Sequence, residues 1–459
     1  MPGGAHNQAK LYWNLRRCIV GMARIISKVP RGERVGVAFS GGLDTCATLC
    51  WIRREGAVPY AYLADTGQPD EPDLNCMAER AIPFGAERSV LVDCREHLAC
   101  AGVNAVRCGA FHISTAGSYY LNTTPISRAI IGVAISARME HDGIHIWCDG
   151  STHKGNDIQR FHIYSSLWHP GLRVYKPWLD TGFVGSMGSR DMLEGFVSSC
   201  GLAWGVRQAL PYSMDASLLG ISYEGKTIER LDSGPCDVRP STPSRKGTVP
   251  RTRRLTLTLN EGWPIGLDGK PYASTAELLQ DLNRLGGSYC IGMSDQVEDR
   301  ILCFKSRGVY EAPGLTILYA AYERLLTCAH DARAIAYYRR CGSCLGRYLY
   351  AGRWFSPSAM MLRDSMERWI ARFATGDVTL TLRREAPHIP VDTFSIALAY
   401  ASDVATMDGA TPSLRPWDRA GQLNVADHGA CVNACTVVRY GLLGILELTC
   451  TGVPTMPLA

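Results

Sequence analysis

The chain has 459 residues, of which 46% are hydrophobic and 20% are charged. This composition excludes disordered and fibrous proteins, and the length predicts two to four domains with a substantial core. The longest apolar runs, Ile130–Ala137 and Tyr440–Leu448, are shorter than the ~18 residues of a membrane span, so we expect no membrane partner. The 18 cysteines are scattered, and we interpret them as thiols of a reducing compartment. The close pair Cys341 and Cys344 has no second pair at zinc-finger spacing nearby, so we predict no metal site.

The formal net charge of +5 comes from the N-terminal segment. Residues 1–32 hold six basic and no acidic residues, which leaves 42 basic against 43 acidic residues, or −1, for the rest of the chain. This balance argues against a nucleic-acid partner. The acid-free segment Arg239–Arg254 is interpreted as a solvated loop. We expect Met22 to be the natural start, with 1–21 derived from an early start codon; the alternative is an Arg-rich transit peptide.

The first two hundred residues alternate short apolar runs with helical patterns. The predicted strands are Arg34–Phe39, Ala57–Ala64, Ser89–Asp93 and Ile144–Cys148, and the predicted helices are Cys46–Glu55, Leu74–Phe84, Glu96–Val106, Arg128–Glu140 and one that begins near Ile158. Strands separated by helices predict a parallel sheet covered on both faces. Ligands of such sheets bind at the carboxyl ends of the strands.

After about residue 195 the pattern changes. Leu255–Leu259 and Val378–Leu382 alternate like half-exposed antiparallel strands, and three amphipathic helices are predicted at Ala276–Leu285, Thr316–Thr327 and Ala359–Ala374. We therefore predict an α/β protein in which a parallel-sheet nucleotide-binding domain precedes an α+β domain and a C-terminal arm. The predicted boundaries are 1–30 for an extension, 31–195 and 196–400 for the two domains, and 401–459 for the arm.

The first chemical signal is the segment Ser40–Cys46, with the sequence SGGLDTC, between a predicted strand and helix. Its two glycines allow the backbone to pass close to a ligand, and the following helix adds its positive N-terminal end. The hydroxyls of Ser40 and Thr45 supply further donors. These features predict a pyrophosphate cradle, although similar turns also occur without ligands. The segment is not G-x-G-x-x-G, so a nicotinamide site has no support.

A second polar loop, Asp149–Asp157, also follows a strand and precedes a helix, so it lies at the same sheet edge. Gly150 and Gly155 allow close approach, and Lys154 is a candidate phosphate ligand. The polar side chains that could hold an amino acid are those of Thr152, Asn156, Asp157 and, one helical turn further, Arg160. The alternative is a polar loop with helix-capping residues.

The segment S-G-G-x-D-T resembles the PP-loop of the N-type ATP pyrophosphatases, which cleave ATP between the α and β phosphates. With the segments 64–71, 108–112, 122–125, 149–160, 175–178, 213–215, 292–300, 305–314 and 349–355, the chain resembles argininosuccinate synthase over about residues 22–385. It departs from the family at Cys46, where Ser is usual, at Ser217, where Asn is common, and over 234–254.

The resemblance implies a PP-loop domain followed by a synthetase and multimerisation domain and a C-terminal oligomerisation arm. It also implies a reaction, in which citrulline attacks the α-phosphorus of ATP with release of pyrophosphate. Aspartate then displaces AMP from the citrullyl-adenylate and forms argininosuccinate. Mg2+ is expected with the nucleotide. The protein is expected to be a cytoplasmic homotetramer.

The resemblance further implies roles for individual residues. The implied ATP ligands are Ala38, Phe39, Ser40, Gly41, Gly42, Leu43, Asp44, Thr45, Cys46, Ala64, Gly150, Thr152, Asp157 and Asp215. The implied citrulline ligands are Tyr120, Asn156, Arg160, Ser213, Ser222, Glu224 and Glu298, and the implied aspartate ligands are Thr152, Asn156 and Asp157. No metal ligand is implied.

Three alternatives are weighed against this hypothesis. Another PP-loop adenylating enzyme, of the tRNA thiolase or amide synthetase type, fits the loop, but the balanced charge argues against tRNA. A non-catalytic nucleotide-binding paralogue is supported by the departures from the family pattern. Finally, the segment Gly220–Thr227 matches the Walker A pattern, with Lys226 as its lysine. We interpret that match as accidental because a polar, turn-rich segment is predicted before it.

Overall fold

The computed structural model describes residues 24–71, 73–169, 171–202, 212–225, 227–230, 232–233, 238, 250–384, 389–396 and 415–439. In the last of these segments, side chains are described only as far as residue 427. The contacts group the chain into two units, Met1–Ala399 and Tyr400–Ala459. The described part of the second unit is helix α14 (Pro416–Arg439), on which Trp417 is exposed. Residues 1–21, Lys226 and the run Tyr440–Leu448 lie outside the described residues.

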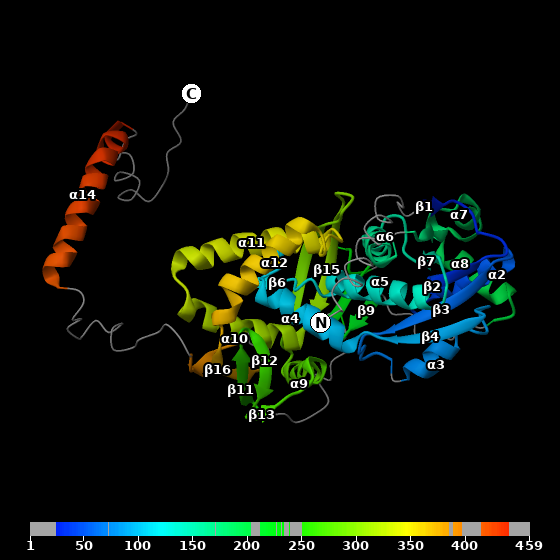
Figure 1. Ribbon diagram of the computed structural model, residues 1–459, viewed down its shortest axis with the longest axis horizontal. Coiled ribbons are helices and arrows are strands. Elements are labelled where there is room, and N and C mark those ends of the chain that lie inside the picture. Colours follow the sequence, from blue (N-terminus) through cyan, green and yellow to red (C-terminus); the bar gives the residue numbers. More distant parts are fainter. Residues whose placement is uncertain are drawn as a thin grey trace, which may run out of the picture. The chain divides into compact units, whose positions relative to one another are not determined.

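A six-stranded parallel sheet forms one half of the first unit (Figure 1). Its strands, in spatial order, are β1 (Arg24–Ile26), β8 (Arg173–Tyr175), β7 (Ile146–Asp149), β2 (Arg34–Ala38), β3 (Val58–Asp65) and β4 (Arg88–Asp93), and every neighbouring pair is parallel. The predicted parallel sheet is thereby confirmed. The chain leaves β2 toward β3 and β4 and returns on the other side at β7. A ligand crevice is expected where the strand order reverses, between β2 and β7.

Helices cover both faces of this sheet. One face carries α2 (Leu43–Arg54), α3 (Leu74–Glu79), α7 (Thr181–Met187) and α8 (Arg190–Ser199), and the other carries α5 (Thr123–His141) and α6 (Asp157–Trp168). The alternation of the strands explains the two layers, because Ala61 packs on the α2 side and its neighbour Tyr62 on the α5 side. The helix predicted to reach Phe84 ends at Glu79, since Pro83 disfavours helical backbone at the residue before it.

The other half of the first unit contains antiparallel sheets. One has the order β14 (Met293–Asp299), β15 (Lys305–Glu311), β10 (Gly220–Glu224) and β9 (Ser213–Ser217). The other has the order β13 (Lys270–Pro271), β12 (Trp263–Leu267), β11 (Thr252–Asn260), β16 (Gly376–Arg383) and β17 (Val391–Phe394), and β5 (Ser114–Thr115) and β6 (Ser118–Tyr119) form a short hairpin. The two strands predicted in this part of the chain pair with one another, with Leu257 opposite Val378.

The Walker A match is part of a sheet. Strand β10 spans its first five residues and pairs on both edges, with β9 and with β15. A strand paired on both edges cannot wrap around phosphates, so this geometry agrees with an accidental match. The segment before it forms strand β9, so the turn-rich structure predicted there is wrong. The error has a physical cause, because β9 is short and mostly polar and therefore lacks an apolar periodicity.

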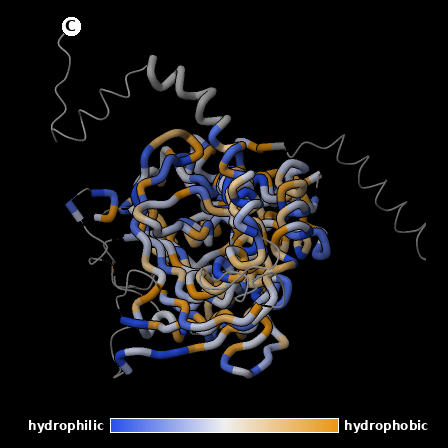
Figure 2. The backbone as a smooth tube through the Cα atoms, turned by 90° about the vertical axis from the view of Figure 1, so that its left-hand side faces the viewer, coloured by the Kyte–Doolittle hydropathy of each residue, from blue (hydrophilic) through white to orange (hydrophobic). Residues whose placement is uncertain are grey.

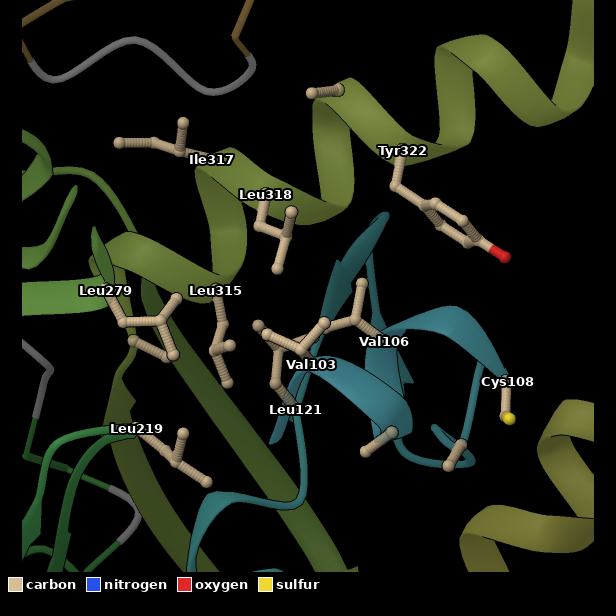
Figure 3. Packing of buried hydrophobic residues seen from close by; sticks show 14 of the residues in the cluster. Val103, Val106, Cys108, Leu121, Leu219, Leu279, Leu315, Ile317, Leu318 and Tyr322 are labelled. Carbon is tan, nitrogen blue, oxygen red and sulfur yellow. The ribbon is translucent and has the colours of Figure 1, made fainter. Parts of the chain in front are cut away.

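Helix α4 (Arg95–Arg107) joins the two halves of the first unit. Its Val103 and Val106 belong to the same buried cluster as Leu279 of α9 (Thr275–Ser288) and Leu318 of α10 (Pro313–Ala329) (Figure 3). Figure 2 shows hydrophobic and hydrophilic stretches alternating along the chain throughout this body. The core therefore crosses the predicted boundary at residue 195 and holds the parallel sheet and the antiparallel sheets in one body.

Helix α11 (Ala332–Tyr350), which precedes α12 (Pro357–Trp369), is not expected from the sequence pattern. Two of its glycines explain both the omission and the packing. A Cβ on Gly342 would lie 2.3 Å from the Gly109 carbonyl oxygen, and one on Gly346 would lie 3.0 Å from Ala110. Glycine weakens the helical signal but allows this close backbone approach. Cys341 and Cys344 lie on this helix as free thiols.

The shared core predicts a large and local stability effect. Leu318→Ala should lower the free energy of unfolding by about 2–5 kcal/mol, because it leaves a cavity beneath α4. Ile82→Ala is the control, since Ile82 is 46% exposed and should change stability by less than ~0.5 kcal/mol. Denaturant unfolding measures both variants. Equal effects would show that α10 is not part of the stabilising core.

Candidate active site

A cavity of about 670 Å³ lies at the carboxyl ends of β2, β3 and β7, and β9, β10 and β14 form its other wall. The residues assigned from the sequence that line it are Ala38, Phe39, Ser40, Gly41, Gly42, Asp44, Thr45, Ala64, Tyr120, Gly150, Thr152, Asn156, Asp157, Arg160, Ser213, Asp215, Ser222, Glu224 and Glu298. Two of the assigned residues, Leu43 and Cys46, do not line it. Segments far apart in the chain thus meet at one cavity.

The loop between β2 and α2 has the open backbone that an anion requires. Gly41 has φ +70°, and Gly42 caps α2 without a side-chain hydrogen bond to the helix. The Thr45 hydroxyl donates to the Gly42 carbonyl at 3.0 Å and lies 3.3 Å from Ser40 Oγ. The first N–H groups of an uncapped helix are free to bind an anion, and the helix dipole favours negative charge there.

Leu43 and Cys46 lie beneath this loop in the core, where the Cys46 thiol donates to the Gly41 carbonyl at 3.7 Å. Both side chains are buried in the cluster that also contains Val197 of α8. Burial raises the pKa of the Cys46 thiol to about 12, so the thiol is neutral at physiological pH. Leu43 and Cys46 can therefore contact a ligand only through their backbone. In contrast, the side chains of Ser40 and Thr45 can contact it directly.

A buried ion pair supports the second loop. Asp149 ends β7 and pairs with Lys176, and the two side chains are 2% and 1% exposed. The same carboxylate accepts hydrogen bonds from Trp147 Nε1 at 2.7 Å and from the Ser151 N–H at 3.0 Å. The pair therefore sets the direction in which the chain leaves β7 and enters the loop. Asp149 is committed to this structural role.

The two loops touch at Gly150. A Cβ at this position would lie 3.0 Å from Thr45 Cγ2 and 3.4 Å from Asp44 Cβ. Only glycine therefore fits without displacing the start of α2, as the sequence predicts for a close approach. Burial raises the pKa of Asp44, which lies in this contact.

Charged side chains from three elements meet in the middle of the cavity. Arg128 of α5 binds Asp157 of α6 at 2.9 Å and Asp215 of β9 at 2.8 Å. Arg160, one turn after Asp157, contacts the same carboxylate at 3.0 Å. Burial opposes ionisation of Asp157 most strongly, but the two arginines together hold its pKa below the usual range. Asp157 is therefore an ionised carboxylate with a fixed orientation.

A chain of hydrogen bonds leads to the acidic end of the cavity. Asn156 Nδ2 donates to the Tyr350 hydroxyl at 2.8 Å, and that hydroxyl donates to Glu298 Oε1 at 2.8 Å. Asn156 Oδ1 accepts from the Ile301 N–H at 2.9 Å. Glu298 Oε2 is buried and has no hydrogen-bond partner among the described residues. This oxygen can therefore accept a hydrogen bond from a bound ligand.

Glu224 of β10 lies at the same end. Its burial, followed by the charges of Glu298, Asp157 and Asp215, raises its pKa to about 7, against the opposing effect of Arg160. Burial also raises the pKa of Glu298. The charge of Glu298 disfavours ionisation of the half-buried Glu224, and a bound cation would relieve this repulsion, so the two carboxyl groups form a subsite for a cation.

Neither Arg128 nor Tyr350 has a role that could be assigned from the sequence. The structure places Arg128 between two carboxylates and Tyr350 between Asn156 and Glu298. Tyr350 lies in the family-like segment 349–355, which is the signal that could have identified it. Thr124 is a third such residue, because its hydroxyl lies 3.2 Å from Asp215 Oδ2 and 3.1 Å from Ser222 Oγ.

Two family models match the chain. The model described as arginosuccinate synthase N-terminal HUP domain matches residues 34–191, and the one described as arginosuccinate synthase C-terminal domain matches residues 212–426. The fold and the first match place the parallel-sheet region in the HUP class of nucleotide-binding domains. Because the two models together span most of the chain, the chain belongs to the argininosuccinate synthase family. This membership implies an ATP-dependent ligase of arginine biosynthesis.

A solved structure of U34-tRNA thiolase NcsA from Methanococcus maripaludis with its [4Fe-4S] cluster is also similar. It has a TM-score of 0.25 and 12% sequence identity, covering 45% of this chain and 69% of that chain. This similarity is too weak to bear on function. No helix within the described ranges has the length and apolar character needed to cross a membrane.

The ion pair beneath the second loop predicts a strong stability effect. Lys176→Met should lower the free energy of unfolding by about 3–5 kcal/mol, because it leaves the Asp149 carboxylate buried without its cation. Lys305→Met is the matched control, since Lys305 pairs with Asp299 while 70% exposed and should cost less than ~1 kcal/mol. Thermal and denaturant unfolding report the difference, and equal losses would contradict the assigned role of the pair.

Proposed function

We propose that the protein joins citrulline and aspartate into argininosuccinate at the expense of ATP, through a citrullyl-adenylate. The observation that carries the proposal is that one cavity connects an anion cradle at Ser40–Thr45 with two carboxyl groups, the half-buried Glu224 and the buried Glu298. A nucleotide triphosphate and an amino acid with a cationic end can thus lie in one space. Proximity and fixed charges then supply most of the catalysis.

The cradle holds the phosphates of ATP. The uncapped start of α2 and the hydroxyls of Ser40 and Thr45 supply donors. A Cβ on Gly42 would have only Ser40 Oγ within 4 Å, at 3.4 Å, so the space beside this residue is open for the nucleotide. Mg2+ enters with ATP, because it usually binds one or two carboxylates together with substrate phosphates. Asp44 is the loop carboxylate available to it.

The acidic end holds citrulline. Glu224 and Glu298 accept hydrogen bonds from the α-ammonium group of the substrate, which supplies the donor that Glu298 Oε2 lacks. The ureido group then extends toward the cradle, where its oxygen attacks the α-phosphorus and pyrophosphate leaves. Arg160 and Tyr350 flank this path. Burial of the carboxylates strengthens their attraction for the ammonium group.

Aspartate is bound at the loop between β7 and α6, where Thr152 and Asp157 line the cavity. The ionised Asp157 accepts a hydrogen bond from the substrate amine and orients its lone pair toward the activated ureido carbon. The amine forms the new C–N bond, AMP leaves and the amine proton is released. The Asn156 side chain is hydrogen-bonded to the protein through both its Nδ2 and its Oδ1. Asn156 therefore positions Tyr350 and the backbone at Ile301.

The family resemblance supports three further expectations. We propose that the parallel-sheet region 31–195 and the region 196–400 act as the nucleotide-binding and synthetase domains. We also propose a cytoplasmic homotetramer, built through the second of these domains and the segment 401–459. Light scattering of the full chain measures the assembly state directly.

The proposed reaction requires both amino acids. With ATP and Mg2+, release of AMP and pyrophosphate should depend on citrulline and aspartate together, because the second displacement regenerates the free site. Coupled assays for both products measure it. Turnover that depends on glutamine, ammonia or tRNA would reject the substrates, and nucleotide binding without any turnover would favour a non-catalytic paralogue.

The cradle can be tested by filling it. Gly42→Val should reduce AMP formation at least 100-fold while preserving the fold, because the φ of −75° at this position suits any residue and the side chain occupies the open space. The control is Gly185→Val on α7, where an added Cβ meets nothing within 4 Å. Circular dichroism checks folding. Normal turnover in Gly42→Val would show that the phosphates bind elsewhere.

The acidic subsite predicts a pH dependence. The pKa of Glu224 is raised to about 7, so this group becomes ionised as the pH rises through 7. The KM for citrulline should therefore fall between about pH 6 and pH 8, because the ionised carboxylate attracts the substrate ammonium group. Glu224→Gln should raise KM and flatten this profile. A wild-type KM independent of pH over this interval would contradict the assignment.

A further inference from the structure

The contact between helices α2 and α8 contains two cysteines that the proposed reaction does not use. Cys50 is buried on α2, and Cys200 is the exposed residue that ends α8. Burial and then the nearby Cys200 thiol raise the pKa of the Cys50 thiol, so the two side chains lie close together. Both are free thiols in the structure. Two neighbouring thiols, one buried and one exposed, can react with one another. The scattered cysteines elsewhere on the described surface lack this arrangement.

The packing of the helices holds the two thiols together. Phe196 of α8 meets the Trp51 ring edge-on with centroids 6.4 Å apart, and the Arg54 guanidinium stacks 4.7 Å from the Phe196 centroid. Val197 and Cys50 share one buried cluster. Residues 193, 196, 197 and 200 recur at the three- and four-residue spacing of one helical face. Cys200 therefore lies on the face of α8 that packs against α2.

We propose that Cys50 and Cys200 form a redox-sensitive pair that closes to an intramolecular disulfide when the protein meets hydrogen peroxide. The proposal is independent of the ligase activity. A disulfide requires an S–S distance of about 2.05 Å, so the two sulfurs must move closer together to form the bond. Cys200 follows the last residue of α8 and precedes Gly201 with φ +76°, so the backbone at this end can adjust.

The chemistry divides between an exposed and a buried sulfur. Cys200 meets the oxidant, and its sulfur attacks one peroxide oxygen to form a sulfenic acid with release of one water molecule. The Cys50 sulfur then attacks the Cys200 sulfur, the S–O bond breaks, and the hydroxide leaves with the Cys50 proton as a second water molecule. Two thiols are oxidised and one peroxide is reduced. Cys50 is buried and Cys200 is exposed, so peroxide reaches Cys200 first and Cys50 takes the second, resolving step.

The bond would tie α2 to α8. Because α2 begins at the anion cradle, oxidation would fix the position of the helix whose N-terminus forms one wall of the nucleotide site. A thiol such as dithiothreitol or glutathione would reverse it by exchange. The pair is thus a modification site between α2 and α8, outside the residues that line the cavity.

The test uses the full-length protein, reduced and freed of reductant, with and without hydrogen peroxide. After the remaining thiols are blocked with N-ethylmaleimide, trypsin digestion without reductant and mass spectrometry identify linked peptides. We expect the peptide with Cys200 to be linked to the peptide that carries Cys46 and Cys50, and dithiothreitol to separate them. Cys303→Ser, which alters another exposed cysteine, should retain the link.

Cys50→Ala distinguishes the two cysteines on the shared peptide. This variant should lose the link, and its Cys200 should accumulate as a sulfenic acid that dimedone labels. Cys200→Ser, at the solvent-exposed end of α8, should also lose the link without a change in fold. A link that survives in Cys50→Ala, or a wild-type Cys200 that stays reduced or proceeds to sulfinic acid without cross-linking, would overturn the proposal.

Discussion

The buried ion pair between Asp149 and Lys176 is the constraint on which the rest of the site depends. Taking two charges out of water is costly, so the pair is tolerable only where further hydrogen bonds satisfy the carboxylate. Trp147 and the Ser151 backbone supply them. The result is a single direction for the chain after β7. Gly150 then packs against the first turn of α2, and the two ligand loops become one surface.

The cavity separates its charges along its length. The anion-binding end consists of backbone groups and hydroxyls, the middle is a balanced set of two arginines and two aspartates, and the far end holds two carboxyl groups. The balanced middle keeps Asp157 ionised, whereas burial raises the pKa values of Glu224 and Glu298 at the far end against the opposing effect of Arg160. This gradient favours a substrate with its cationic end at Glu298 and its reacting end at the phosphates.

Helix α4 explains why the two halves of the cavity keep their relative position. It precedes the antiparallel sheets in sequence by more than a hundred residues, yet it packs against α9 and α10 in a common core. Leu218 and Leu219, in the turn between β9 and β10, belong to this core, which thus links the strands that carry Asp215 and Glu224 to the rest of the body. Preorganised positions of this kind reduce the free energy needed to orient substrates.

Much of the fold could be predicted from the sequence. Parallel strands buried on both faces are continuous apolar runs, so β2, β3, β4 and β7 were visible, and the glycine-rich loop after β2 indicated a phosphate site. Strands β9 and β10 were not predicted, because β9 exposes polar residues to the cavity and has no apolar alternation. Helix α11 was not predicted because its glycines weaken the helical pattern, although they allow close packing against the backbone of Gly109 and Ala110.

The sequence by itself determined the parallel-sheet architecture, the anion cradle and, through the family resemblance, the set of candidate ligands, because these depend on local periodicity and ordered motifs. Only the tertiary structure decided that Arg128 bridges Asp157 and Asp215, that Tyr350 links Asn156 to Glu298, and that Cys50 lies near Cys200. Local patterns carry no information on these pairs. Their distances and pKa shifts arise from burial and from charges on segments that only folding brings together.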